Sequence, residues 1–448
     1  MLRIFNFVTG RKPGIIGKEE RWIICFSKDL DILSHVCSRW RQIALASSAL
    51  WSHIDLAHHH HLDPGLIARA KEYATRARRL PLGIHIIDPY FDHHAIPPAD
   101  IDNLNFLPPD TPIRSLELVS YRSFRDSHFV LLRYYFENCV PSQLKQLTIW
   151  CASDPQGGFL ESTERPKQPN TPQIDMRESH LEAFLAQISV LQLNGLCFRW
   201  TSKAYHNLVD LRLCFDLTYL PTTISESQLV EIIKSSPRLR IFHVCLRITD
   251  PLPIDSPVLP VRLDDLEVFH LQTRWRDELT TFIRWIEPGA KPLQLFITSW
   301  LSEQLDRFFA HSNVTRLRIF SPGGNSLNYI LSRIPQLRVL IVDDYTTEEV
   351  GVMSLMSDHI PPVKLEVLYL IGGTIRRTEL RQLVEQYSVQ RLVISETMVM
   401  QDDTDHEVDD IPGLRQELLS CPVFEYYTEE LEPPGPMSHW DDLDGPCY

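Results

Sequence analysis

One apolar phrase recurs along most of the chain, from residue 113 to residue 394. Each copy has an apolar residue, two variable residues, an apolar residue, one variable residue and a third apolar residue. The copies are Ile113/Leu116/Leu118, Leu144/Leu147/Ile149, Ile188/Leu191/Leu193, Leu208/Leu211/Leu213, Leu239/Phe242/Val244, Leu266/Phe269/Leu271, the weaker Leu293/Leu295, Val314/Leu317/Ile319, Leu337/Leu340/Val342, Leu365/Leu368/Leu370 and Val389/Leu392/Ile394. The last two apolar residues of a copy are two positions apart, so they point to the same side of a β-strand, and the residue between them points to the other side. The phrase therefore predicts many short strands, each with one buried side.

Helices are predicted between these strands. Ser225 and Gln228 form a capping-box pattern before an apolar run, and Thr346 and Glu349 repeat it. Most successive copies of the phrase lie about 20–31 residues apart, a spacing similar to the roughly 20–29 residues of a leucine-rich repeat. This resemblance implies an α/β solenoid with parallel strands on its concave face and helices outside. The alternative is an α/β domain whose strands are unrelated.

The residue between the two apolar positions of each strand is a candidate for contact with a target. We expect this set on the concave face, and its mixed chemistry favours a protein or peptide partner over a small molecule. The alternative is that most of the set are merely exposed strand residues. The candidates are Glu117, Thr148, Gln192, Arg212, His243, His270, Arg318, Ile341, Tyr369 and Val393.

A different pattern precedes the repeats. Residues 33–54 place apolar side chains at helical spacing, which predicts a helix with one buried side and then a second short helix. The segment resembles the second half of an F-box, as found ahead of leucine-rich repeats in F-box-like proteins abundant in mushroom-forming fungi. Ile4 and Phe5 resemble the end of the opening F-box helix, whereas the Leu-Pro pair of that helix is absent. The matching residues are Leu33, Val36, Cys37, Trp40, Arg41, Ala44, Leu50, Trp51 and Ile54.

The resemblance implies a function without bond chemistry. An F-box binds the Skp-type adaptor of a cullin-based ubiquitin ligase, so the chain would be a substrate-recognition subunit that holds an unknown target protein on its repeats. The adaptor contacts of the missing Leu-Pro pair are not carried over. The alternative is a non-catalytic leucine-rich-repeat scaffold that has lost adaptor binding.

Composition along the chain predicts its division. The stretch from Ser153 to Pro172 is rich in Pro, Gly and polar residues, which predicts an exposed loop. After Ser395 the chain is acidic and then Pro-rich, which favours a solvated tail. The predicted parts are an F-box-like segment at 1–56, a linker and capping unit at 57–110, the repeat array at 111–425 with an insertion near 152–177, and a tail at 426–448.

Composition also excludes several classes of partner. The formal net charge of −14 argues against a nucleic-acid-binding surface. No apolar run approaches the roughly 18 residues that would span a bilayer, so no membrane partner is expected. The nine cysteines are scattered without a CxxC pair, which favours reduced thiols and a cytoplasmic or nuclear location.

Catalytic and metal-binding motifs are weak. His58–His61 is a run of imidazoles, but consecutive residues on one element rarely converge on a single ion. The sequence has no His-Glu-x-x-His, no phosphate-binding Gly-rich loop with Lys and no Gly-x-Ser-x-Gly. We therefore expect no cofactor and no metal, and a metal-dependent enzyme is the third and least favoured hypothesis.

Overall fold

A computed structural model of the chain describes most of the repeats and part of the segment before them. The described residues are 14–18, 21–25, 32, 35–57, 63–88, 107, 111–120, 123–151, 158–166, 171–214, 222–253, 256–273, 276–298, 303–320, 324–346, 364–402, 407–408 and 411–427.

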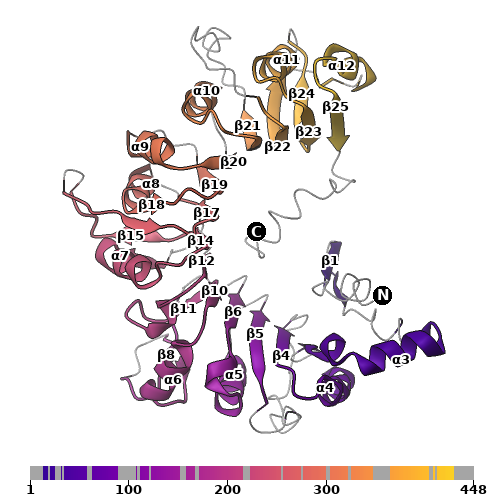
Figure 1. Cartoon of the computed structure of the whole chain (residues 1–448), viewed down its shortest axis with the longest axis vertical. Helices are drawn as coiled ribbons and strands as arrows, with labels where there is room; N and C mark the ends of the chain where they lie inside the picture. Colours follow the sequence, from indigo (N-terminus) through magenta and orange to yellow (C-terminus); the bar gives the residue numbers. More distant parts are fainter. Residues whose placement is uncertain are drawn as a thin grey trace. The chain divides into compact units, whose positions relative to one another are not determined.

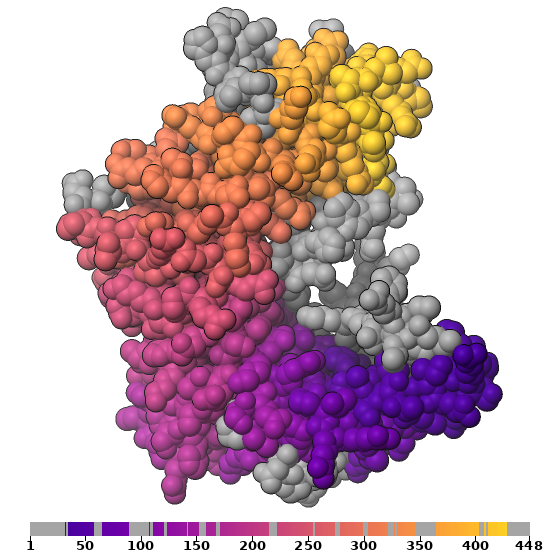
Figure 2. All heavy atoms as spheres, viewed as in Figure 1, coloured from indigo at the N-terminus to yellow at the C-terminus, as the bar shows by residue number. Residues whose placement is uncertain are grey.

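The chain forms two compact units, Met1–Thr222 and Thr223–Tyr448. The division falls inside the predicted repeat array. Figure 2 shows that segments close in the sequence lie against one another within each unit. No helix among the described residues has the length and apolar character needed to cross a bilayer.

The first unit contains a parallel sheet with helices on one of its faces (Figure 1). Its strands occur in the order β3-β4-β5-β6-β10-β12. Strands of this series that follow one another along the chain therefore lie side by side in the sheet. The strands are β3 (His53–Ala57), β4 (Leu82–Asp88), β5 (Ile113–Ser120), β6 (Gln146–Cys151), β10 (Val190–Leu193) and β12 (Asp210–Leu213), and the helices are α3 (Ser38–Ala46), α4 (Asp63–Ala77), α5 (Asp126–Asn138) and α6 (Glu178–Leu185), with 3₁₀ turns η1 (Ser48–Trp51), η3 (Pro141–Gln143) and η4 (Lys203–Tyr205).

The second unit repeats this arrangement with parallel strands in the order β14-β17-β19-β20-β21-β22-β23-β25, and β24 also pairs with β22. Its helices again lie on one face of the sheet (Figure 1). The strands are β14 (Ile241–Val244), β17 (Val268–Leu271), β19 (Leu293–Thr298), β20 (Val314–Phe320), β21 (Val339–Thr346), β22 (Val367–Arg376), β23 (Arg391–Ser395), β24 (Met398–Met400) and β25 (Val423–Tyr427), and the helices are α7 (Glu226–Ser235), α8 (Arg276–Ile283), α9 (Glu303–His311), α10 (Gly324–Arg333), α11 (Arg377–Gln386) and α12 (Ile411–Glu417).

Short strand pairs lie outside the main parallel strands of each unit. Those in parallel orientation are β11 with β7 and β8 with β9 in the first unit, and β13 with β15 and β16 with β18 in the second. The hairpin β1–β2 is antiparallel. Their bounds are β1 (Gly14–Lys18), β2 (Arg21–Cys25), β7 (Gly158–Phe159), β8 (Glu161–Ser162), β9 (Gln173–Ile174), β11 (Leu196–Cys197), β13 (Thr223–Ser225), β15 (Arg247–Thr249), β16 (Val261–Leu263) and β18 (Ile286–Pro288).

The recurring phrase explains why these strands stack. Every copy contributes a strand to a parallel sheet, and equivalent apolar residues are register partners, as Leu118 is with Ile149 and Leu317 with Leu340. The apolar pairs are buried on the side of the sheet that carries the helices. The predicted α/β class with parallel strands alternating with helices is therefore confirmed.

The predicted start of α7 is also confirmed. Ser225 Oγ accepts a hydrogen bond from the Gln228 backbone N–H over 3.3 Å, and Gln228 Oε1 accepts one from the Ser225 N–H over 3.2 Å. The two side chains satisfy backbone donors that a helix leaves without partners at its first turn.

A buried histidine ties α5 to the end of β4. The Arg125 backbone N–H donates to His128 Nδ1 over 2.9 Å, so the ring proton lies on Nε2. That nitrogen donates to Asp88 Oδ2, also over 2.9 Å, and both side chains are buried. The pair fixes where the helix rests on the sheet.

The predicted insertion is partly built into the first unit. Residues Leu160, Ser162 and Ile174 are buried, and the Leu160 N–H donates to the Cys197 carbonyl over 2.7 Å. The exposed loop expected over 152–177 is thus wrong for these positions. The Pro/Gly content identified a break in the repeat spacing, but it could not show that β7 and β8 pair with other short strands.

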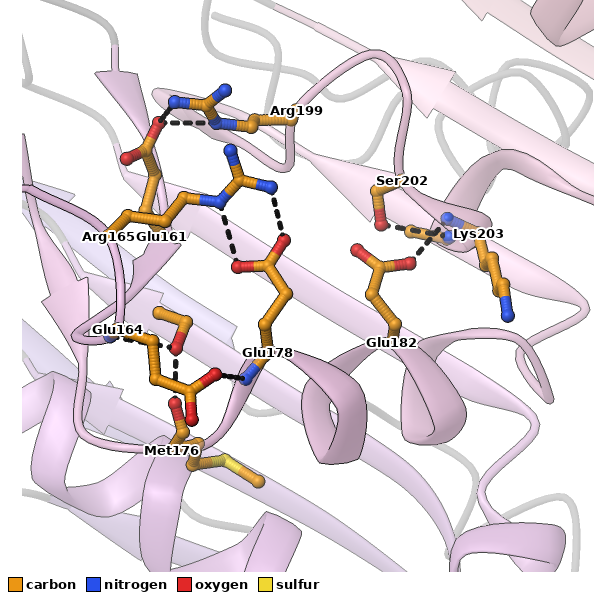
Figure 3. Close-up of polar contacts among 11 residues, drawn as sticks. Glu161, Glu164, Arg165, Met176, Glu178, Glu182, Arg199, Ser202 and Lys203 are labelled. Atoms are coloured by element: carbon orange, nitrogen blue, oxygen red, sulfur yellow. Dashed lines mark hydrogen bonds and ion pairs between the residues drawn. The ribbon is translucent and has the colours of Figure 1, made fainter.

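Ion pairs hold this inserted segment to α6 and to the residues that follow β11 (Figure 3). Arg165 makes two hydrogen bonds to the Glu178 carboxylate, of 2.8 and 2.6 Å. Arg199 Nε donates to Glu161 over 2.6 Å. A two-pronged guanidinium–carboxylate contact fixes direction as well as distance, so the segment has a defined position against the repeats.

One further expectation is corrected. The solvated tail expected after Ser395 is wrong for the residues that form β24, α12 and β25. Gly372 and Gly373 lie inside β22 at φ +66° and +77°. A Cβ on Gly373 would lie 2.1 Å from the Tyr345 carbonyl oxygen, so glycine there allows close approach of two strands.

Candidate functional site

Each main sheet has a face opposite its helices, which we call the helix-free face (Figure 1). Side chains alternate between the two faces of a strand, so the residue between two buried apolar positions lies on this face. The register aligns these residues into one row in each unit. The first-unit row is Asp55, His85, Glu117, Thr148, Gln192 and Arg212, and the second-unit row is His243, His270, Phe296, Arg318, Ile341, Tyr369, Val393 and Glu425.

The first-unit row begins with a carboxylate held by two imidazoles. Asp55 Oδ1 lies 3.0 Å from His53 Nε2 and 3.3 Å from His85 Nδ1. Burial alone would raise the pKa of Asp55, but the hydrogen bonds from His53 and His85 outweigh it and hold that pKa well below its usual range. His85 Nε2 also lies 3.9 Å from Glu117 Oε1. These groups stabilise one another across three strands.

The rest of this row is polar and internally paired. Thr148 Oγ1 donates to Gln192 Oε1 over 3.4 Å. Arg212 makes two hydrogen bonds to the Asp210 carboxylate, of 3.0 and 2.9 Å, with both side chains largely buried. Four predicted contact residues, Glu117 among them, thus lie together on one face. Their role in binding a target stays a prediction.

The second-unit row is aromatic and apolar. The rings of His243 and His270 have centroids 3.9 Å apart, and His270 lies 4.0 Å from Phe296. The Arg318 guanidinium lies 5.4 Å from the centre of the Phe296 ring. A guanidinium over a ring face is attracted by the ring quadrupole. The row therefore places a positive charge beside aromatic and apolar side chains.

An apolar cluster occupies the centre of this helix-free face. It consists of Phe296, Ile341, Tyr369 and Val393, which are 1–6% exposed. Tyr427 of β25 packs against it, as do three aliphatic side chains from neighbouring positions of the same face. The helices of the unit lie on the other side of the sheet (Figure 1), so they do not account for this burial.

Two ion pairs border the apolar cluster. Arg318 Nε donates to Asp343 Oδ2 over 2.6 Å, and both side chains are largely buried. Burial raises the pKa of Asp343, and the charge of Arg318 only partly offsets this. On the other border, Arg391 lies 2.9 Å from a Glu425 oxygen, and Tyr427 Oη donates to Glu425 over 2.9 Å.

Three buried polar atoms near the cluster have no hydrogen-bond partner among the described residues. They are Tyr369 Oη, Asp343 Oδ1 and Arg391 Nε. A buried polar atom left without a partner costs about 1–3 kcal/mol. Burial raises the pKa of Tyr369, so its hydroxyl stays protonated and able to donate at neutral pH. Together the three atoms offer two donors and one acceptor beside an apolar surface.

The F-box-like residues divide into two groups. Leu50, Trp51 and Ile54 are buried, and η1 and β3 pack against α4. Ile54 lies in β3, the edge strand of the sheet, which spans the predicted boundary between 1–56 and 57–110. The predicted second short helix is the 3₁₀ turn η1.

Several residues of the other group are exposed, contrary to the buried side expected for the first helix. Ile32 is 61% exposed and Val36 58%, and Leu45 is exposed as well. Cys37 and Arg41 are exposed, Trp40 is partly buried, and Ala44 is the buried residue of α3, which extends away from the sheet at its N-terminal edge (Figure 1). Leu33, Ile4 and Phe5 lie outside the described residues.

The sequence also held signals that identify further residues of the two rows. Phe296 stands between Leu295 and Ile297. It was missed because the recurring phrase was recognised there only as the weaker copy Leu293/Leu295. Asp55 and His85 stand between buried apolar pairs in the same way, ahead of the region where the phrase was recognised.

Metal binding finds no support in the described part of the chain, where no group of three or more His, Cys, Asp or Glu side chains could hold an ion. The run His58–His61 lies outside the described residues.

A scan of the sequence against protein-family models gives no match, and a search of curated proteins gives no significant similarity.

Proposed function

We propose that the chain is the substrate-recognition subunit of a Skp-cullin-F-box type ubiquitin ligase. In this proposal the strand–helix units are leucine-rich repeats, the α3 segment binds the adaptor, and the helix-free faces bind a target protein. The protein performs no bond chemistry, and its contribution is to raise the local concentration of target lysines near the conjugating enzyme. It would act in the cytoplasm or the nucleus, without a cofactor.

The observation that carries the proposal is the exposed apolar surface around α3. Ile32, Val36 and Leu45 face solvent in the segment whose residues resemble an F-box. Burying one Val- or Leu-sized side chain contributes about 1.5–3 kcal/mol. Because only 39–61% of each of these three residues is still exposed, covering them could supply gross contact energy of about 2–5 kcal/mol to a partner. Trp51 and Ile54 hold the base of the segment from inside the fold.

Adaptor binding is tested by co-purification of a Skp-type adaptor with the full chain. Val36→Asp should abolish capture, because it places a charge in the proposed contact without disturbing a buried residue. The matched control is Leu419→Asp, since Leu419 is 83% exposed in the second unit and should leave capture unchanged. Equal capture by both variants would remove α3 from the interface.

The alternative is a non-catalytic scaffold that uses the same helix-free faces. If the unaltered chain captures no adaptor, the receptor proposal is wrong and the scaffold is preferred.

A further inference from the structure

We infer that residues 256–262, here called the proline segment, are a docking site on the second unit for a polyproline-binding domain of the SH3 type. Domains of this type hold an extended Pro-x-x-Pro stretch in a groove lined by aromatic side chains. The inference adds a second partner to the proposed function and does not depend on it.

The first step is the sequence of the proline segment. It reads Ser-Pro-Val-Leu-Pro-Val-Arg, so that Pro257 and Pro260 are three positions apart and Arg262 follows two positions later. A proline fixes its own φ at about −65° and disfavours the helical region for the residue before it. The two prolines and the residues that precede them are therefore restricted to an extended backbone, the range that includes the polyproline II helix.

The second step is the backbone of the segment in the fold. Residues 257–260 belong to no helix or strand, and they make no backbone hydrogen bond to any other part of the chain that the structure describes. The chain joins a strand pair only at Val261, whose N–H donates to the Trp285 carbonyl over 2.8 Å. A polyproline II helix has no internal hydrogen bonds. The segment therefore meets the backbone requirement of such a ligand.

The third step is the exposure of the side chains. A polyproline II helix has about three residues per turn, so Val258 and Val261 share one edge and the other positions form the remaining two edges. Val258 and Val261 are half-buried. The other residues from position 257 onward are exposed, and Leu259 is 84% exposed. The segment thus rests on the second unit by one edge and presents two edges to solvent, which carry Pro257, Leu259, Pro260 and Arg262.

This division between buried and exposed edges is the one that binding in such a groove requires. Two neighbouring edges of the helix enter the groove, where each proline packs with the residue before it against aromatic rings, and the third edge stays outside. Leu259 and Pro260 form such a pair on the exposed edges. Because the segment is already extended in the folded chain, its binding costs less conformational entropy than that of a flexible peptide.

An open hollow beside the segment leaves room for those rings. It has a volume of about 610 Å³ and is lined by Pro257 and Pro260 of the segment and by Arg307 and Phe308 of α9, among other residues. The prolines thus border open space that aromatic side chains of a partner can enter.

Arg262 gives the site its charge and its direction. Its guanidinium pairs with Asp264 over 2.7 Å, and the two side chains are 71% and 63% exposed. An ion pair this exposed contributes little to stability, so the guanidinium can exchange Asp264 for a carboxylate of the partner. The partner therefore carries an acidic residue at the end of its groove.

The same spacing of residues occurs at Pro109, Pro112 and Arg114, in a different setting. There the Pro112 carbonyl accepts a hydrogen bond from the Leu82 N–H over 2.7 Å, and Ile113 is buried in β5. The backbone at Pro112 is part of the sheet and cannot enter a groove, so Arg114 is a matched control for Arg262.

The test is titration of the full-length chain with a purified SH3-type domain that selects Pro-x-x-Pro-x-Arg peptides, followed by isothermal titration calorimetry. The unaltered chain should bind the domain saturably. Pro260→Ala, Leu259→Ala and Arg262→Gln should each weaken binding about tenfold, because each removes a group from the exposed edges. Asp264→Asn should strengthen binding about twofold, since it releases the Arg262 guanidinium.

Two control substitutions alter side chains outside the segment. Leu419→Ala replaces a leucine that is 83% exposed, as a match for Leu259, and Arg114→Gln is the match for Arg262. Both should leave the affinity for the domain unchanged. Circular dichroism and thermal melting confirm that each variant is folded.

The inference is overturned if the unaltered chain does not bind the domain, or if either control weakens binding as much as Arg262→Gln does. Adaptor capture is measured separately through α3, and Val36→Asp should leave binding of the SH3-type domain unchanged. Adaptor capture without domain binding rejects this inference alone, whereas domain binding without adaptor capture rejects the proposed receptor alone.

Discussion

The indole nitrogen of Trp51 donates a hydrogen bond to the carbonyl oxygen of Ala44 over 2.8 Å. The bond joins the end of α3 to the 3₁₀ turn that leads into the sheet. The same indole packs edge-on against Tyr73 of α4, with ring centroids 5.0 Å apart, and under the Arg76 guanidinium. Trp51 is therefore the residue that attaches the exposed α3 to the core of the first unit.

Replacing Trp51 should destabilise the first unit far more than replacing Trp40. Trp51 is fully buried, so Trp51→Ala should lower the free energy of unfolding by about 3–5 kcal/mol. Trp40 is only partly buried, and Trp40→Ala should cost about 1 kcal/mol. Urea unfolding, monitored by hydrogen exchange of backbone amides in the first unit, measures the loss for both variants. Similar losses from the two variants would mean that α3 is held by other contacts.

Breaking a buried ion pair should destabilise the second unit. Glu226 is fully buried, and it accepts hydrogen bonds from Arg284, from the Trp285 indole and from the Leu252 backbone N–H. Glu226→Ala would leave an uncompensated buried guanidinium, so we expect a loss of about 3–5 kcal/mol in the free energy of unfolding.

The control for this substitution is Glu303→Ala. Glu303 forms an exposed pair with Arg307 one helical turn later, and such pairs contribute about 0.3–0.5 kcal/mol. Chemical denaturation of the two variants in parallel should separate them clearly. Equal midpoints would show that the buried pair adds little.

Acid should remove the contribution of Asp55 to stability. Because its pKa is lower in the folded state than in the unfolded state, Asp55 stabilises the fold when the pH is above the unfolded value of about 3.9. That stability is lost as the pH falls below this value toward the folded pKa. The difference in unfolding free energy between the unaltered chain and Asp55→Asn should be largest near neutral pH and shrink below about pH 5. Urea titrations from pH 7 to pH 3 measure it, and a pH-independent difference would contradict the assignment.

Two glycines should respond oppositely to the same substitution. Gly373→Ala forces a side chain into a backbone at φ +77°, with its Cβ inside contact distance of Tyr345, and should cost more than about 1–2 kcal/mol. Gly65 lies in α4 with open space around its Cβ position, so Gly65→Ala should stabilise the chain by up to about 1 kcal/mol. Thermal melts of the two variants should shift in opposite directions.

Much of the fold was predictable because its signals are local. Alternation over two residues is visible within a single strand, so the copies around Leu147 or Leu340 located strands and their buried sides. The capping pattern at Ser225 and Gln228 is equally local, and both of its hydrogen bonds are present. The candidate row on the helix-free face followed from the same alternation, which is why Glu117, His243 and Arg318 line up with their neighbours.

Other features depend on contacts between distant residues. Val36 has the spacing of a buried helix face, yet it is exposed, because burial depends on which other segment packs there. Gly373 sits inside a strand because Tyr345 of the neighbouring strand approaches it. The Pro/Gly-rich insertion could not be placed from composition, since Arg165 meets Glu178 only after the chain has turned back.

The amino-acid sequence by itself determined the strands of the recurring phrase and the side of each that is buried, because these follow from the order of apolar and polar residues along a few positions. Only the tertiary structure decided that Ile54 belongs to the edge strand of a sheet, that much of α3 faces solvent, and that Asp343 and Arg391 lie beside the apolar cluster that contains Tyr369. Those features depend on which segments meet in space, and spacing along the chain does not specify that.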